Sequence, residues 1–433
     1  MTNANYKETI DFLYSRLPMF SRIGASAIKK DLTNTKILCE KLGHPESGFK
    51  TIHVAGTNGK GSTSHMLASI FQTAGYKTGL YTSPHLHDFR ERIRINGEMV
   101  REDFVVDFTE KVTPLIDEIE PSFFEITVVM AFEYFAEEEI DIAIIETGLG
   151  GRLDSTNVIV PELSVITNIG WDHMNILGDS LAKIASEKAG IIKKGIPVVI
   201  GETQSETKNV FIEKASDMNA PIVFADQQRF VNGWTNNRGF LTAEIADHHH
   251  QDHQKYDLDL TGIYQLKNLV TVLEVVSQMQ KRGWTIVSED VKTALQNVMR
   301  LTGLHGRWEV IHHKPMVVLD VGHNEDGMKQ IMNQVTLTDH HHLHIIIGMV
   351  KDKEVDKVLK LLPQNAKYYY THADIPRALD AERLKDKAIQ NGLEGEIYPD
   401  VNTALQDAII ASTPDDLILV CGSVFLVGEV HRI

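Results

Sequence analysis

Residues 51–62, TIHVAGTNGKGS, run from a short β-rich segment through a glycine-containing loop, and a helix is predicted directly afterwards over 64–74. Glycines let backbone amides crowd around phosphate oxygens, and the N-terminus of the following helix adds partial positive charge. Lys60 can neutralise the terminal phosphates of a nucleotide, and Ser62 can contact phosphate or metal. Val54 stands where a strict Walker loop has its first glycine. An ordinary glycine-rich turn is the alternative, but the strand–loop–helix setting favours phosphate binding.

The chain around this loop alternates between predicted strands and helices. In the first part, strands are predicted at 78–84, 140–152, 162–170 and 196–201, and helices at 6–45, 101–119, 125–138, 180–193, 265–283 and 288–300. Polar hairpins or loops are expected over 227–260. Alternation then restarts, with strands at 316–320, 343–348, 367–371 and 416–421 and helices near 325–334, 353–362, 380–390 and 402–412. Such alternation predicts parallel sheets with helices on their faces.

These elements predict an α/β protein with two domains. We expect an N-terminal P-loop ATPase domain with a mostly parallel sheet over residues 1–298, and a smaller C-terminal Rossmann-like α/β domain over 299–433.

Composition restricts the partners and the compartment. Lys and Arg total 43 and Asp and Glu total 59, which gives a net charge of -16 and argues against nucleic acid or an anionic membrane as partner. Only two cysteines are present, Cys39 and Cys421, as expected in a reducing compartment. We find no signal-peptide pattern at the N-terminus and no apolar run long enough for a membrane helix. The sequence therefore predicts a cytoplasmic protein.

Polar side chains stand at the ends of three predicted strands. Ser83 ends the second strand, Glu146 ends the third, and the pair Asp172-His173 follows the fourth. In an open parallel sheet ligands bind beyond the carboxyl ends of the strands, so these groups are candidates to hold Mg²⁺ beside the loop. Histidine is a less usual ligand of Mg²⁺, so the site needs another anionic donor. Lys188 could supply one only if its side chain carried a CO₂ adduct; otherwise it is an ordinary helix lysine.

Several motifs, in order along nearly the whole chain, resemble one family. They are HVAGTNGKGST, SPHL with ERIRING, FFE, ETGLGGRLDSTN, WDHMNILGDS, EKAGIIKKGIPV, YQLKNL, LHGRWEV, LDVGHNEDG and CGSVFLVGEV. In this combination the sequence resembles the folylpolyglutamate synthase/dihydrofolate synthase family of the Mur ligase superfamily. The resemblance implies an ATP-dependent carboxylate–amine ligase that uses ATP and Mg²⁺ and adds L-glutamate to dihydropteroate, to reduced folates, or to both.

The resemblance also implies a role for individual positions. Nucleotide-binding roles fall on Thr57, Asn58, Gly59, Lys60, Gly61, Ser62, Asn268, Arg307, Asp320 and His323. Metal-binding roles fall on Ser83, Glu146, His173 and a carbamylated Lys188, and catalytic roles on Lys60, Glu146, His173, Lys188 and Arg307. Pterin-site roles fall on Phe124, Asp154 and Ser155. Plainer interpretations stand beside these, because Phe124 could be a core aromatic and Asp320 a helix cap.

Three alternatives stay open at this point. The enzyme could be a folylpolyglutamate synthase only. It could be a Mur-type ligase acting on another carboxylate, although a cell-wall Mur ligase is expected to carry a further UDP-binding domain ahead of the phosphate loop. A non-catalytic nucleotide-binding protein on the same fold is the third alternative, and the intact Lys60, Glu146, His173 and Lys188 argue against it. The resemblance suggests a monomer.

Overall fold

The computed structural model describes residues 3–24, 29, 31–237, 239–248, 253–351 and 353–432. The chain forms two compact units. Unit 1 comprises 1–170, 174–259 and 265–304, and unit 2 comprises 171–173, 260–264 and 305–433. The last junction between the units thus falls at 304/305, six residues after the domain boundary expected from the sequence. Two short pieces that precede this junction in the chain, 171–173 and 260–264, belong to the second unit.

Unit 1 is built on an eight-stranded sheet in the order β4-β3-β2-β5-β1-β6-β7-β8. Its strands are β1 Lys50–Ala55, β2 Thr78–Tyr81, β3 Ile93–Ile95, β4 Glu98–Met99, β5 Ile142–Glu146, β6 Leu163–Ile166, β7 Val198–Ile200 and β8 Ile222–Phe224. The six strands from β2 to β8 in this order are parallel, and β3 and β4 form an antiparallel hairpin at one edge. The central strands β1, β5 and β6 are rich in isoleucine, valine and leucine, as expected for strands buried on both faces.

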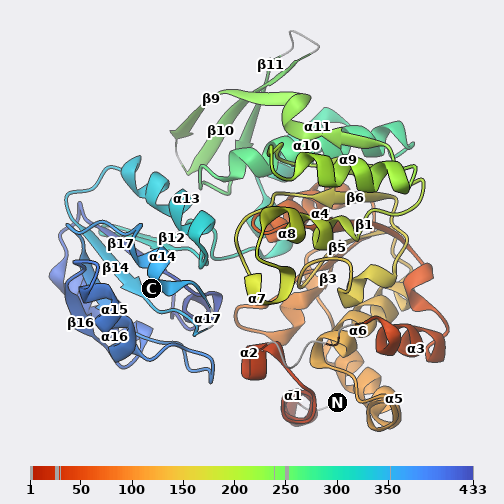
Figure 1. Cartoon of the computed structure of the whole chain (residues 1–433), viewed down its shortest axis with the longest axis horizontal. Coiled ribbons are helices and arrows are strands. Elements are labelled where there is room, and N and C mark those ends of the chain that lie inside the picture. Colours follow the sequence, from red (N-terminus) through yellow and green to blue (C-terminus); the bar gives the residue numbers. More distant parts are fainter. Residues whose placement is uncertain are drawn as a thin grey trace. The chain divides into compact units, whose positions relative to one another are not determined.

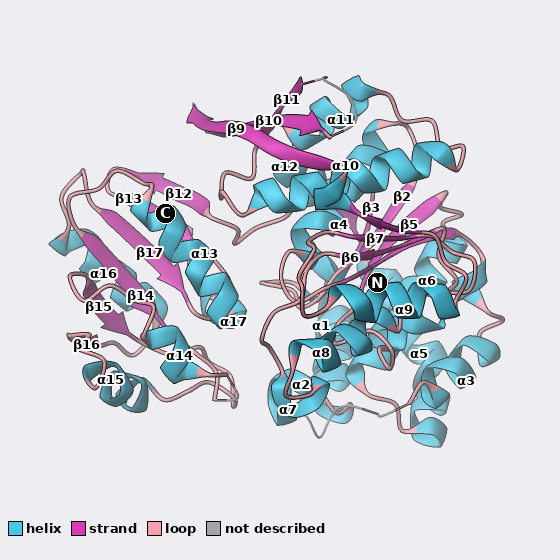
Figure 2. Cartoon of the chain, turned by 45° about the horizontal axis from the view of Figure 1, so that its top comes forward, coloured by secondary structure: helices cyan, strands magenta, loops and turns pink. Residues whose placement is uncertain are grey.

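Helices cover both faces of this sheet (Figure 1). The longer ones are α1 Asn3–Arg16, α3 Thr33–Lys41, α4 Lys60–Thr73, α5 Glu102–Ile119, α6 Phe123–Glu137, α8 Leu181–Ala189, α9 Lys208–Asp217, α10 Gln265–Lys281 and α11 Ser288–Leu295; the short ones are α2 Phe20–Ile23, α7 Met174–Leu177 and α12 Val298–Thr302. Helices α4, α10 and α11 pack together on one face, and α5 and α6 lie on the other (Figure 2). The single helical stretch predicted over 6–45 is wrong, because α1, α2 and α3 are separate helices; residues 25–28 and 30 lie outside the described part of the chain.

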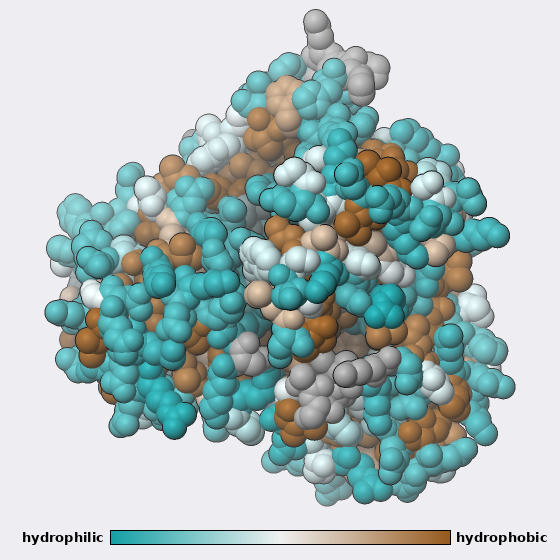
Figure 3. Space-filling model, in the orientation of Figure 1, coloured by the Kyte–Doolittle hydropathy of each residue, from teal (hydrophilic) through white to brown (hydrophobic). Residues whose placement is uncertain are grey.

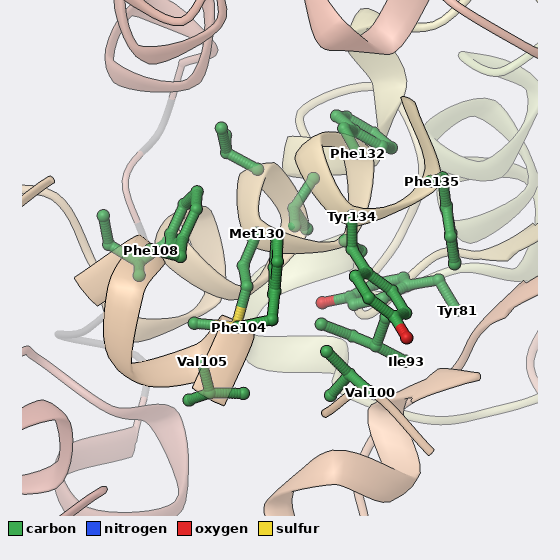
Figure 4. Packing of buried hydrophobic residues seen from close by; sticks show 14 of the residues in the cluster. Tyr81, Ile93, Val100, Phe104, Val105, Phe108, Met130, Phe132, Tyr134 and Phe135 are labelled. Carbon is green, nitrogen blue, oxygen red and sulfur yellow. The ribbon is translucent and has the colours of Figure 1, made fainter. Parts of the chain in front are cut away.

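A hydrophobic core of unit 1 lies between the sheet and the pair α5 and α6. Figure 4 shows aromatic and aliphatic side chains of both helices pointing toward one another. Phe104 of α5 and Tyr134 of α6 place their ring centroids 4.7 Å apart, and Met130 of α6 is fully buried. Aromatic side chains contribute large buried areas, so this layer fixes α6 and the loop before it, which carries Ser122.

A small antiparallel sheet, β11-β10-β9, belongs to unit 1. Its strands are β9 Arg229–Asn237, β10 Phe240–Asp247 and β11 His253–Leu258. This confirms the hairpins expected over 227–260, apart from residues 238 and 249–252, which lie outside the described residues.

Unit 2 is built on a six-stranded sheet in the order β12-β13-β17-β14-β15-β16. Its strands are β12 Glu309–His313, β13 Met316–Leu319, β14 Leu343–Ile347, β15 Lys367–Tyr370, β16 Gly395–Ile397 and β17 Leu417–Cys421, and its helices are α13 Glu325–Thr336, α14 Val355–Leu359, α15 Ala381–Ile389, α16 Val401–Ala411 and α17 Val424–Gly428. All neighbours are parallel except β12, which is antiparallel to β13. The predicted α/β class, with a parallel-rich first domain and a smaller second α/β domain, is confirmed.

Hydrophilic residues dominate the face seen in Figure 3, with apolar patches scattered between them. Scattered apolar residues are normal on protein surfaces. None of the helices in the described ranges combines the length and apolarity that crossing a bilayer requires.

Candidate active site

Residues 56–62, called the phosphate loop below, comprise the connection after β1 and the first three residues of α4. Gly59 has a φ of +80°, and a Cβ there would lie 2.3 Å from Oδ1 of Asn268. Gly56 is still tighter, because a Cβ would lie 1.9 Å from Oγ1 of Thr167. Both positions therefore require glycine, and the backbone amides at the start of α4 stay open to an anion.

The end of β6 holds the phosphate loop in place. Thr57 donates its backbone N–H to the carbonyl of Asn168 at 3.0 Å, and Asn58 donates its own to Oδ1 of the same Asn168 at 2.9 Å. Thr167 donates its hydroxyl to the carbonyl of Asn58 at 2.6 Å. The loop is thus fixed before any ligand arrives, which lowers the entropy lost on binding. Asn168 was not among the predicted site residues, although it lies in the strand predicted at 162–170.

Two lysines converge on the first residue of the phosphate loop. Lys60 donates its ammonium to the carbonyls of Gly56 at 3.1 Å and Thr57 at 3.3 Å. Lys188, which is only 4% exposed, donates to the same Gly56 carbonyl at 2.8 Å. Two positive charges and a helix N-terminus therefore meet at one loop, which makes it a site for a polyanion. The structure brings the predicted Lys60 and Lys188 together here.

Helix α10 supports the loop from the other side. Gln265, which is fully buried, donates Nε2 to Oγ of Ser62 at 3.1 Å and accepts from Nδ2 of Asn268 at 2.7 Å. The predicted Asn268 thus lies directly against Gly59. Gln265 was missed as a site residue, although it stands inside the YQLKNL motif, because the motif alone does not say which of its side chains face the loop.

Ser83 and Glu146 occupy the same edge of the sheet as the phosphate loop. Glu146 ends β5 opposite Val54 of β1 and is 4% exposed, and Ser83 follows β2, the other neighbour of β5. A carboxylate and a hydroxyl are suitable oxygen donors for Mg²⁺, which usually takes one or two carboxylates together with nucleotide phosphates. Lys188 as an ammonium cannot ligate a cation, whereas a carbamylated Lys188 could. Among the residues that the structure describes, no three His, Cys, Asp or Glu side chains form a metal-binding group on their own.

The predicted pterin residues lie around the loop that follows β5. Phe124, at the start of α6, packs so closely on Gly148 that a Cβ there would be 2.4 Å from Cζ of the ring. Asp154 is buried, and its carboxylate accepts from the backbone of Leu149 at 2.7 Å and of Thr156 at 3.0 Å. Burial raises the pKa of Asp154 despite these hydrogen bonds. Asp154 is thus an internal brace of this loop, and the adjacent Ser155 begins the short helix that Asp154 caps.

In unit 2, Asp320 follows β13 and is 3% exposed. Its carboxylate accepts from the Tyr264 hydroxyl at 2.6 Å, from the Trp308 amide at 2.9 Å and from the Gly322 amide at 2.9 Å. Burial raises the pKa of Asp320, and burial together with the Asp320 charge raises that of Tyr264 well above its ordinary value. Arg307 donates to the carbonyl of Gly306 at 3.1 Å, and its charge acts on Asp320.

A second group in unit 2 surrounds Asp172. Its Oδ1 lies 2.5 Å from Nζ of Lys353, and its Oδ2 accepts from Nδ2 of Asn324 at 3.2 Å and lies 3.6 Å from Nε2 of His323. Burial opposes ionisation of Asp172, but the hydrogen bond from His323 and the charges of His173 and Lys353 keep its pKa well below the ordinary value. The predicted His173 and His323 are therefore neighbours in this unit, and Lys353 is a member that sequence reasoning missed.

Comparison with protein families matches the two units to two domain models. Residues 54–276 match the model described as "Mur ligase middle domain", and residues 306–424 match "Mur ligase, glutamate ligase domain".

Similar proteins cover nearly the whole chain. The dihydrofolate synthase/folylpolyglutamate synthase of Bacillus subtilis is 32% identical, over 99% of this chain and 98% of its own length. The structure of Escherichia coli FolC in complex with DHPP and ADP is similar with a TM-score of 0.84 and 26% identity, over 98% of this chain and 96% of that one. A bifunctional folylpolyglutamate synthase/dihydrofolate synthase with Mn, AMPPNP and L-glutamate bound is similar with a TM-score of 0.80 and 27% identity, over 93% of each chain.

Proposed function

Because the chain belongs to the dihydrofolate synthase/folylpolyglutamate synthase family of Mur ligases, we propose that it joins L-glutamate to dihydropteroate and to reduced folates. The protein is an ATP-dependent ligase. The observation that supports this function best is the phosphate loop, which is braced by Asn168 and Gln265 and flanked by the ammonium groups of Lys60 and Lys188.

A carboxylate does not condense with an amine at neutral pH, because hydroxide is a poor leaving group. In the proposed reaction a carboxylate oxygen of the pterin substrate attacks the γ-phosphorus of ATP, and ADP leaves. The glutamate nitrogen then attacks the acyl phosphate carbon, loses a proton, and phosphate leaves. The loop amides and Lys60 would hold the phosphates and stabilise the charge that develops during phosphoryl transfer. Arg307 would act on the transferring group, and Asp320 would hold the ribose.

The Ser83 hydroxyl and the Glu146 carboxylate, both in unit 1, are compatible with Mg²⁺. We propose that Ser83 and Glu146 hold it, and that His173 and a carbamylated Lys188 contribute further ligands. When bound, the ion supplies positive charge to the phosphate oxygens. Carbamylation would convert the Lys188 ammonium into an oxygen donor. The contact between the Lys188 ammonium and the Gly56 carbonyl would then be lost. Phe124, Asp154 and Ser155 are proposed to shape the pterin site, Asp154 by bracing the loop that carries Gly148.

The decisive measurement is ADP release by the purified protein with Mg·ATP and L-glutamate. It compares dihydropteroate, tetrahydrofolate and no pterin. Turnover with both pterins supports the bifunctional assignment, and turnover with one restricts the enzyme to one step. ADP release that needs neither pterin but responds to another carboxylate would overturn the proposed substrate.

Lys60→Ala tests the role of the phosphate loop. We expect ligation to fall by at least about 100-fold, because a preorganised charge at the transferring phosphate is lost. Lys255→Ala is the matched control, since Lys255 is an exposed lysine on β11. Full ATP-dependent ligation by Lys60→Ala would refute the proposed chemistry.

A further inference from the structure

Residues Trp171–His173 belong to unit 2, although both of their neighbours along the chain, Gly170 and Met174, belong to unit 1. Gly170 is fixed there by Thr57, whose hydroxyl exchanges hydrogen bonds with the Gly170 backbone at 3.0 and 3.2 Å. A three-residue strap anchored in unit 2 thus begins one residue after a contact of the phosphate loop. Side-chain contacts within unit 2 hold this strap in place.

The strongest of these contacts is the ion pair between Asp172 and Lys353. Nζ and Oδ1 are 2.5 Å apart, and the two side chains are only 8% and 11% exposed. Asn324, whose Oδ1 caps α13, donates Nδ2 to the other carboxylate oxygen at 3.2 Å. A buried ion pair with extra hydrogen bonds is costly to break from one side, because the remaining charge is left unpaired. The pair therefore fixes the Asp172 side chain tightly.

His173 contacts the same carboxylate oxygen as this ion pair. The φ of His173 is +51°, in the left-handed region that non-glycine residues rarely adopt. Its backbone N–H donates to Oδ1 of Asp172 at 2.8 Å, the same oxygen that Lys353 contacts. Nε2 of His173 lies 3.4 Å from Nζ of Lys353. Strained residues of this kind persist where their surroundings hold them, and they cluster at functional sites.

We propose that Lys353 is a positioning residue for the ligase reaction. Acting through Asp172, it holds the strap Trp171–His173 within unit 2 and sets the backbone conformation and ring orientation of His173, a proposed metal ligand. The inference rests on the proposed function for its kinetic consequence. Its structural content, the dependence of His173 on Lys353, can be tested without turnover. Second-sphere partners of a metal ligand typically change metal affinity by about 10- to 100-fold.

The experiment uses the full-length protein with Lys353→Met, which keeps the length of the side chain and removes its charge. Lys353→Arg tests rescue of the charge. Lys360→Met is the matched control, because Lys360 is an exposed lysine at the end of α14. Asp172→Asn and the double variant Asp172→Asn/Lys353→Met complete a double-mutant cycle. Readouts are kcat and KM with dihydropteroate, the Mg²⁺ dependence of kcat, and Mn²⁺ binding with AMPPNP followed by electron paramagnetic resonance.

For Lys353→Met we expect a kcat about 10- to 100-fold lower, since a small displacement of a reacting group has this effect. We expect a KM for ATP within about twofold of the parent and Mn²⁺ binding weaker by about 10-fold. Lys353→Arg should recover part of both losses, and Lys360→Met should match the parent. The double variant should be no worse than the more damaged single variant, because both residues act through one contact.

Parental kcat and Mn²⁺ affinity in Lys353→Met would overturn the proposal, as would an equal loss in Lys360→Met. If Lys353→Met does not fold, as judged by circular dichroism, Lys353→Arg and Asp172→Asn decide the question by the same Mn²⁺ measurement. If the parent protein ligates no folate but the Mn²⁺ difference remains, the proposed function fails and the role of Lys353 stands.

Discussion

At the scale of single residues, the two ends of α4 offer a controlled test of the phosphate loop. Gly59 precedes the helix and Gly75 follows it, and both have positive φ, of +80° and +93°. A Cβ at Gly59 would strike Asn268, whereas a Cβ at Gly75 would meet nothing within 4 Å. Gly75→Ala should therefore cost only the backbone strain, about 1–2 kcal/mol. Gly59→Ala should cost more and also weaken ATP binding.

The measurements are chemical denaturation for stability and nucleotide titration for affinity. Equal loss of stability in the two variants, with unchanged ATP binding in Gly59→Ala, would contradict the close contact between Gly59 and Asn268.

His53 predicts how stability depends on pH. Burial, with a smaller effect of the Lys193 charge, lowers the pKa of His53 to about 3, and its Nε2 is hydrogen-bonded to Oγ1 of Thr156 at 2.8 Å. The unfolded chain binds a proton near pH 6.5, but the folded chain does so only near pH 3. The contribution of neutral His53 to the free energy of unfolding is complete above pH 6.5. This contribution is lost as the pH falls from 6.5 toward 3, by up to about 1.4 kcal/mol per pH unit.

The check is the pH dependence of the free energy of unfolding in His53→Gln, which should have a shallower slope between pH 6.5 and 4 than the parent. Thr156 contacts both His53 and Asp154. Burial raises the pKa of Asp154, so this group makes the protein less stable as the pH rises, opposite to His53. The slope of the parent alone therefore mixes the two effects, and only the difference between the parent and His53→Gln reports on His53. His341→Gln is the control, because His341 is exposed. An unchanged slope in His53→Gln would exclude this contribution.

At the scale of elements, we predict that the close contact between Gly148 and the Phe124 ring couples the loop after β5 to the start of α6. Gly148→Ala should push the Phe124 ring, destabilise the fold by about 1–3 kcal/mol, and raise the KM for dihydropteroate. The same substitution in a Phe124→Ala background should cost less than about 0.5 kcal/mol, since the clash is gone. Gly233→Ala is the control, because its nearest contact would be 3.9 Å away. Additive free energies in the two backgrounds would contradict the contact.

Elements with strong patterns could be predicted from the sequence, and those defined by tertiary contacts could not. The parallel core strands are apolar on both faces, so β1, β5 and β6 were evident. The two-residue strand β4 and the edge strands β8 and β16 were missed, because they are too short to show a period. The predicted strand ends also placed Ser83 and Glu146 at one edge of the sheet, as the structure has them. Gln265 and Lys353 could not be found this way, because their roles depend on partners about 180 to 200 positions away.

At the scale of the whole molecule, each unit has its own core, so ligand binding can be followed separately in each. We predict that AMPPNP slows hydrogen exchange of amides in 56–62 of unit 1, because the phosphate loop binds its phosphates. If Asp320 also holds the ribose, amides in 320–323 of unit 2 should be protected as well. Saturating ligand at about 100 times its Kd would add about 2.7 kcal/mol of stability.

Two variants separate these effects. Lys60→Ala should weaken protection of both segments, because one of the groups that hold the nucleotide phosphates is lost. Asp320→Asn should keep protection of 56–62 and lose that of 320–323. Asp320 already accepts hydrogen bonds from Tyr264, Trp308 and Gly322, so a purely structural role is the competing explanation. Protection confined to 56–62 in the parent protein would favour that explanation and leave the phosphate loop as the site that holds the nucleotide.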